Sequence, residues 1–226
     1  MGRPINADAD ATRARILHSA LQLFSAHGID GASIRDVAKG AGVSLAMVHH
    51  YFGSKDDLHR AVIQSMYAEL ATMREMLVSA IARSEATSGS IEDLLESAVV
   101  EGYRFARAHV TEVRLMLRDA VLSGTLPEGG RESLEPFLDL ASERLAPLVS
   151  RPAGALRLPL QSIIFLVARY AVQSDSESAL VSGEIAAHAP RAIERHLVEL
   201  ARTLLLSPRK NPSSDRLRSP NRSQPC

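Results

Sequence analysis

Apolar residues recur at helical spacing along most of the chain, and this pattern predicts an all-α protein. Apolar positions three or four residues apart mark one face of an amphipathic helix, whereas strict alternation, the mark of a half-buried strand, does not occur. Polar and glycine-rich stretches at residues 84–90, 123–130 and 175–183 are expected to be loops. The predicted helices span residues 12–27, 33–40, 44–52, 54–83, 91–108, 112–122, 132–149, 160–174 and 184–206.

Residues 33–52 predict two short helices joined by a glycine turn. Ser33 can cap the first helix, with Asp36 three residues later forming a capping box. Gly40 and Gly42 favour a sharp exit, because glycine adopts the left-handed conformation without a steric penalty. Ser44 then offers a second N-cap. This is the pattern of a helix-turn-helix, whose second helix enters the major groove of DNA.

The second of these helices is expected to have an exposed face. Val43, Val48 and Phe52 fall at spacings that can face the preceding helix. An exposed face of mixed apolar and histidine composition predicts a binding partner. The residues left pointing outward are Leu45, Ala46, Met47, His49 and His50.

The segment from Ser33 through Tyr51-Phe52-Gly53-Ser54-Lys55 resembles the DNA-binding signature of TetR-type transcriptional regulators. The resemblance covers about the first quarter of the chain. It implies an N-terminal three-helix DNA-binding domain and a C-terminal helical bundle for dimerisation and effector binding. His49 and Ala46 depart from the signature, which usually has a tyrosine and a glycine or proline at these positions.

The resemblance also assigns roles to individual residues. It places Leu45, Ala46 and Met47 near bases, and it leaves His50 able to contact either bases or the backbone. The remaining residues of the implied DNA-binding set, expected near the sugar-phosphate backbone or at the helix start, are Ser33, Arg35, Ser44, His49, Tyr51 and Lys55.

Composition and charge limit the kind of DNA binder. The 26 Lys and Arg balance the 26 Asp and Glu, which argues against coating nucleic acid through bulk basicity. A specific binder needs only a local basic footprint, for which Arg3, Arg13, Arg15, Arg35, Lys39 and Lys55 are candidates. Cys226, the single cysteine, allows no internal disulfide, and no signal peptide or membrane span is expected, so we expect a cytoplasmic protein.

Three regions follow from these patterns. Residues 1–53 are expected to bind DNA, with residues 1–10 as a disordered arm. Residues 54–207 are expected to form the effector-binding and dimerisation domain, entered by the unusually long helix at 54–83. Residues 208–226 are rich in Pro, Ser, Asn and Arg, and we expect a disordered basic tail.

The last predicted helix suggests how two chains associate. Its apolar residues follow a heptad-like spacing, which suits helix-on-helix packing. Together with the preceding helix, it predicts an intermolecular four-helix bundle in a homodimer. The residues of this stripe are Ala186, Ala189, Ile193, Leu197, Leu200 and Leu204.

A helical bundle can also enclose an apolar cavity for a small-molecule effector. Arg169 is the most informative candidate, because an arginine in an apolar helix needs a carboxylate, water or an anionic ligand. Either an ion pair across the dimer or a bound ligand would satisfy it. The predicted effector-binding residues are Met66, Tyr103, His109, Phe137, Phe165 and Arg169.

Other chemistry is not indicated. The sequence contains no phosphate-binding glycine loop, nucleophile elbow or histidine pair with metal-ligand spacing, so neither a metal, a cofactor nor an enzymatic activity is expected. The resemblance to TetR-type regulators therefore implies a homodimeric repressor that binds a palindromic DNA operator and is released by a small molecule. Two alternatives are a DNA binder without a ligand, and a helical enzyme or carrier in which residues 33–52 are only structural.

Overall fold

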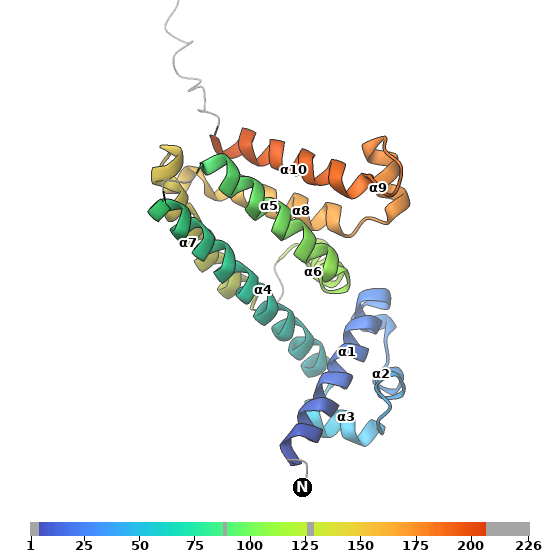
Figure 1. Ribbon diagram of the computed structural model, residues 1–226. Coiled ribbons are helices and arrows are strands. Elements are labelled where there is room, and N and C mark those ends of the chain that lie inside the picture. Colours follow the sequence, from blue (N-terminus) through green and yellow to red (C-terminus); the bar gives the residue numbers. More distant parts are fainter. Residues whose placement is uncertain (1–4, 88–89, 126–128, 207–226) are drawn as a thin grey trace, which may run out of the picture.

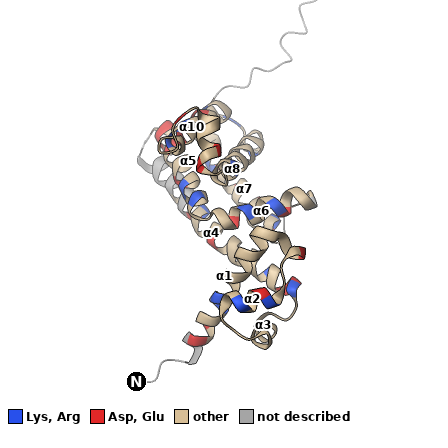
Figure 2. Ribbon diagram, turned by 90° about the vertical axis from the view of Figure 1, so that its right-hand side faces the viewer, with Lys and Arg blue, Asp and Glu red and all other residues tan. Residues whose placement is uncertain are grey.

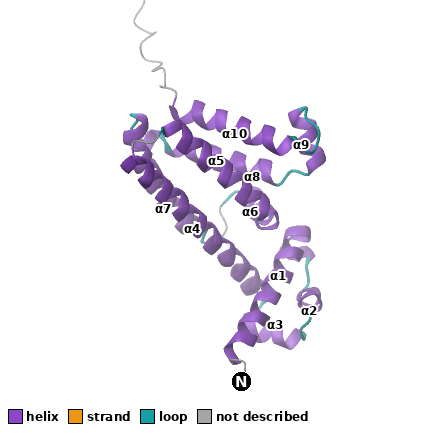
Figure 3. Cartoon of the chain, viewed as in Figure 1, coloured by secondary structure: helices purple, strands orange, loops and turns teal. Residues whose placement is uncertain are grey.

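The computed structural model describes residues 5–87, 90–125 and 129–206, and these residues form helices and connecting turns without a strand (Figures 1 and 3). The all-α expectation is confirmed for this part of the chain. The helices are α1 (Ile5–Gly31), α2 (Ile34–Ala41), α3 (Leu45–Phe52), α4 (Lys55–Thr87), α5 (Ile91–Ala108), α6 (Val110–Ser123), α7 (Gly130–Val149), the 3-10 turn η1 (Ala153–Ala155), α8 (Arg157–Ala171), α9 (Asp175–Ser182) and α10 (Ala189–Leu206).

Several boundaries differ from the expectations. Helix α1 begins at Ile5, so most of the expected arm is helical, and α4 extends to Thr87, inside the expected loop. Residues 175–182 are helix α9 rather than a loop, because the Ser174 hydroxyl caps the Glu177 amide. The expected tail at 208–226 and Arg3 lie outside the described residues.

A first core cluster closes the N-terminal part of the molecule. Helices α1, α2 and α3 are too short to enclose a core alone, and α4 and α6 complete it. The largest fully buried contribution of α6 to this cluster is Leu115. The first core cluster therefore includes residues on both sides of residue 53. Its principal members are Ile16, Ala20, Phe24, Val37, Val48, Leu58, Val62, Ile63, Met66 and Leu115.

A second core cluster lies in the bundle formed by α5, α8 and α10, which pack against one another. The long helix α4 runs between this bundle and the N-terminal helices and packs on α5 and α7 (Figure 1). Because α4 contributes to the first core cluster and packs on α5 and α7, it connects the N-terminal helices to the bundle without an intervening linker. The fully buried members of the second cluster include Tyr103, Leu156, Leu197 and Leu205.

The heptad-like stripe of α10 packs largely inside the chain's own core. Ala189, Ile193 and Leu197 are at most 3% exposed. The first stripe residue, Ala186, precedes α10, because the helix begins at Ala189 with Pro190 in its first turn. The heptad-like spacing therefore predicted a packing face of α10, and much of that face packs against other helices of the same chain.

Among the described residues, no single helix is both long and apolar enough to cross a membrane. The segments Ala153–Ala171 and Asp175–Ser182 meet the length and composition criteria only as a pair, and they are bent by 119° relative to each other.

Two helical glycines lie in different surroundings and give opposite predictions. A Cβ added at Gly40 in α2 would overlap the Oγ of Ser19, which donates to the Val37 carbonyl at 3.0 Å. A Cβ added at Gly102 in α5 would have no neighbouring atom within 4 Å.

We expect Gly40→Ala to lower the free energy of unfolding by about 1–3 kcal/mol through overpacking. Gly102→Ala is expected to raise it by about 0.4–1 kcal/mol, because alanine restricts the unfolded chain more than glycine does. Urea denaturation followed by circular dichroism measures both changes. A stabilised Gly40→Ala variant would contradict the packing described for α1 and α2.

Candidate nucleic-acid interface and ligand cavity

Helices α2 and α3 form the helix-turn-helix that the sequence predicts. The Ser33 Oγ accepts the Asp36 amide at 3.1 Å, and the Ser44 Oγ accepts the Met47 amide at 3.2 Å, so both helices are capped at their N-termini. Gly42 ends α2 with φ 64° and ψ 40°, the left-handed conformation that glycine adopts without strain. The turn therefore has a fixed geometry.

Helix α3 presents its N-terminal residues to solvent. Val48 is 1% exposed and anchors the helix in the first core cluster, while Leu45 and Met47 are 36% and 38% exposed. Ala46, His49 and His50 are exposed as well. A helix that is anchored by one valine and open on the opposite side has the form needed to enter a groove of DNA.

Two side chains of the predicted DNA-binding set already have partners within the chain. The His49 Nδ1–H donates to the carbonyl of Gly53, which follows α3, at 2.7 Å, so a neutral His49 has only an acceptor at Nε2. The Lys55 Nζ donates to the Ala32 carbonyl at 3.2 Å. Tyr51 is half-buried. His49 can therefore donate to a phosphate oxygen only when it is protonated.

The charge around the helix-turn-helix is mixed. Arg35 and Lys39 are exposed on α2, but Asp36 lies on the same helix (Figure 2). Helix α3 itself carries no Lys, Arg, Asp or Glu. Arg13 on α1 lies over the Phe52 ring at 5.3 Å, so its position is fixed near the end of α3. The cationic groups of this surface therefore come from α1, α2 and the start of α4.

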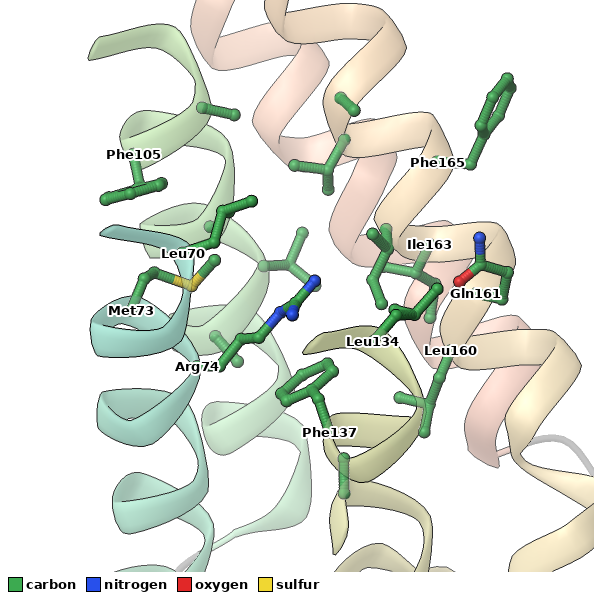
Figure 4. A pocket seen from close by; sticks show the side chains of 18 of the residues that line it. Leu70, Met73, Arg74, Phe105, Leu134, Phe137, Leu160, Gln161, Ile163 and Phe165 are labelled. Atoms are coloured by element: carbon green, nitrogen blue, oxygen red, sulfur yellow. The ribbon is translucent and has the colours of Figure 1, made fainter. Parts of the chain in front are cut away.

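A cavity of about 310 Å³ lies between the long helix α4 and helices α5 to α8. This volume is at the lower end of the range for small-molecule sites. The lining is almost entirely aliphatic and aromatic, and its polar side chains are Tyr67, Arg74 and Gln161. Figure 4 shows the Arg74 guanidinium directed into the cavity beside Phe137, with Leu134 and Ile163 across from it.

The predicted effector-binding residues divide into two groups. Phe137 and Phe165 line the cavity, although Phe165 is 50% exposed. Met66 belongs to the first core cluster and Tyr103 to the second. His109 and Arg169 also lie away from the cavity wall.

The side chains of His109 and Arg169 both have partners within the chain. His109 stacks on Phe105 with ring centroids 4.2 Å apart, and its Nδ1–H donates to the Phe105 carbonyl at 3.0 Å. Arg169 forms an ion pair with Glu177 of α9 at 2.8 Å. The carboxylate that Arg169 requires is therefore supplied by its own chain.

Sequence reasoning missed Arg74 and Gln161. Arg74 lies one helical turn beyond Leu70 and two beyond Tyr67, so the apolar stripe of α4 itself placed it on a buried face. That spacing was the available signal. Gln161 carried none, because one glutamine in an apolar helix can equally face solvent.

Helix α6 connects the cavity to the DNA-binding unit. Val113, Met116 and Leu117 line the cavity, while Leu115 belongs to the first core cluster. The Arg118 Nη2 donates to the carbonyl of His27 in α1 at 3.3 Å. Asp119 lies 3.2 Å from the His59 Nε2 of α4. A displacement of α6 at the cavity would therefore act directly on α1 and α4.

Comparisons with known proteins agree with this architecture. Residues 16–62 match the family model for bacterial regulatory proteins of the tetR family. The chain is 33% identical to the HTH-type transcriptional regulatory protein RaaS of Mycobacterium tuberculosis over 132 residues, which cover 58% of each chain. It is 28% identical to the probable HTH-type transcriptional regulator YttP of Bacillus subtilis over 116 residues, covering 51% of this chain and 54% of that relative.

These matches span little more than half the length of either relative, and both are named as transcriptional regulators rather than as enzymes. The crystal structure of a TetR-like transcriptional regulator from Rhodococcus sp. RHA1 extends the likeness in fold. It matches with a TM-score of 0.61 at 21% identity, covering 92% of this chain and 100% of that one. Residues 16–62 therefore carry the DNA-binding domain of the tetR family of bacterial regulatory proteins, and the chain has the fold of a TetR-like transcriptional regulator.

Proposed function

We propose that this protein is a homodimeric transcriptional repressor that binds a palindromic operator through α3 and is released by a small-molecule effector. The observation that carries the proposal is the exposed N-terminal face of α3, which is anchored by Val48 beneath it. Two such helices related by a two-fold axis would occupy successive major grooves about 34 Å apart. A regulator of this kind acts on the bacterial chromosome, so we place it in the cytoplasm.

The chemistry of α3 indicates how bases would be read. Leu45, Ala46 and Met47 carry no side-chain hydrogen-bond donor, so their contribution would be apolar contact with thymine methyl groups. His50 can add a hydrogen bond to a base or a phosphate. Arg35 and Lys39 would neutralise phosphates and fix the register of the complex. Ser33, Tyr51 and Lys55 lie near the same backbone in this arrangement.

Exposed apolar side chains support dimerisation through the last helices. Leu158 on α8 is 73% exposed and Phe165, two turns further along the same helix, is 50% exposed. Leu180 and Val181 on α9 are 82% and 55% exposed. Since α10 buries much of its own stripe within the chain, we assign the principal contact to α8, with α10 beside it.

The cavity supports control by a ligand over control by concentration alone. A ligand in this cavity would contact α4 and α6, the two helices that also enter the first core cluster. If it favours one arrangement of these helices, it shifts the spacing of the two α3 helices. A coupling free energy of roughly 1–3 kcal/mol would change operator affinity about 5- to 150-fold.

The α3 assignment predicts a contrast between two kinds of substitution. Leu45→Ala and Met47→Ala should each weaken binding to the selected operator by about 1–3 kcal/mol, with little effect on a scrambled duplex, because they remove base contacts. Lys39→Gln should weaken both complexes and reduce the salt slope by about one, because it removes a phosphate contact. Fluorescence anisotropy on a site selected from random DNA measures each effect. Equal losses on both duplexes for Met47→Ala would contradict base reading by α3.

The dimer assignment predicts a second contrast, between two leucines of nearly equal exposure. Leu158→Glu should shift the protein to monomer and reduce operator binding at least tenfold, because a charge in the centre of an apolar contact is left unpaired. Leu122→Glu on α6 should do neither, although Leu122 is 74% exposed and Leu158 is 73% exposed. Sedimentation velocity gives the oligomeric state. A dimeric Leu158→Glu variant would remove α8 from the interface.

A further inference from the structure

The cavity carries a cation that no described carboxylate pairs. The Arg74 Nη1 donates to the Ser133 carbonyl at 2.7 Å and to the Ser133 hydroxyl, and the guanidinium lies 5.3 Å from the centre of the Phe137 ring. Within the described residues, no Asp or Glu side chain forms an ion pair with Arg74. Because an arginine stays protonated in proteins, its charge remains in an apolar wall.

Two further polar groups of the cavity are buried without a hydrogen-bond partner among the described residues. Tyr67 is 8% exposed, and its hydroxyl lies two helical turns before Arg74 on the same face of α4. The Oε1 of Gln161, on α8, is also buried and unpartnered. Buried polar groups are nearly always hydrogen-bonded, so unsatisfied groups in a ligand-sized cavity point to a ligand.

The lining limits the charge and size of that ligand. A neutral apolar ligand would leave Arg74 without a counter-charge, and a cation would be repelled by it. A ligand with several charges would place the additional ones against the leucines and isoleucines of α5, α7 and α8. The volume of about 310 Å³ leaves room for an apolar body of moderate length.

We infer that the effector is an apolar monocarboxylate, whose carboxylate is held by Arg74 and the Tyr67 hydroxyl and whose hydrocarbon body lies between α5, α7 and α8. The planar guanidinium and the phenolic O–H both donate to carboxylate oxygens. A hydroxyl or amide N–H on the ligand body could donate to Gln161. This inference rests on the proposed effector function of the cavity.

Octanoate and octanol provide matched probes, because they share a chain length and differ in the charged group. Isothermal titration calorimetry on the full chain should show octanoate binding at least tenfold more tightly than octanol. Arg74→Gln should weaken octanoate binding about tenfold to a hundredfold and change octanol binding less than about threefold. Tyr67→Phe should weaken octanoate binding about threefold to tenfold while leaving the shape of the cavity unchanged.

Two controls keep the test independent of folding. Arg191→Gln, at an exposed site on α10, removes an arginine outside the cavity and should leave octanoate affinity unchanged. Arg74→Lys keeps the charge and should retain more of the octanoate preference than Arg74→Gln. Circular dichroism identifies any variant that fails to fold, and the Tyr67→Phe result then decides.

The possible outcomes separate this inference from the proposed function. Equal affinity for octanoate and octanol, unchanged by Arg74→Gln and Tyr67→Phe, would overturn the carboxylate assignment. The cavity would then bind an effector of a different chemical class. Binding of neither probe at millimolar concentration would overturn the inference as well, while operator binding, measured separately by anisotropy, would still support the DNA-binding function. Preferential octanoate binding that depends on Arg74 and lowers operator affinity would support both.

Discussion

The packing of one long helix against both halves of the molecule is the constraint on which the rest of the structure depends. Helices α1 to α3 cannot enclose a core by themselves, and they take Leu58, Val62 and Ile63 from the first turns of α4. The same helix then packs on α5 and α7 and supplies Tyr67 and Arg74 to the cavity wall. Because α4 and α6 complete the core of α1 to α3, these three helices are too small a unit to be stable on their own.

Helix α6 reinforces this connection from a different direction. It buries Leu115 in the first core cluster and presents neighbouring residues to the cavity, and Arg118 contacts the backbone of α1. Helices α4 and α6 therefore both connect the cavity wall to the core that underlies the helix-turn-helix. Coupling by packed helices with two arrangements is a physical route, and it requires no contact between the ligand and α3.

The cavity combines this connection with an electrostatic imbalance. Burial lowers the pKa of Arg74 and raises the pKa of Tyr67, which are the directions expected when water is removed from a guanidinium and a phenol. Because a guanidinium stays protonated in proteins, Arg74 keeps its charge in this wall. A ligand carboxylate would pair with the positive charge of Arg74. Its binding would then favour the arrangement of α4 and α6 that closes around the ligand.

Local features of the sequence predicted the fold well, and long-range ones predicted the cavity poorly. The caps at Ser33 and Ser44 and the turn at Gly42 depend on neighbouring residues, so their positions follow from the sequence. Which side chains meet between helices depends on tertiary packing. The ion pair of Arg169 with Glu177 and the cavity position of Arg74 therefore became visible only in three dimensions.

Fluorescence anisotropy can show directly whether the protein binds a specific DNA sequence. The purified full chain is titrated against duplexes from upstream of its own gene and from a random-pool selection, with scrambled duplexes as controls and salt varied. We expect saturable binding by two chains per site, a preference for the native or selected duplex, and a loss of affinity as salt rises. Equal affinity for selected and scrambled duplexes would show that the protein does not read a DNA sequence.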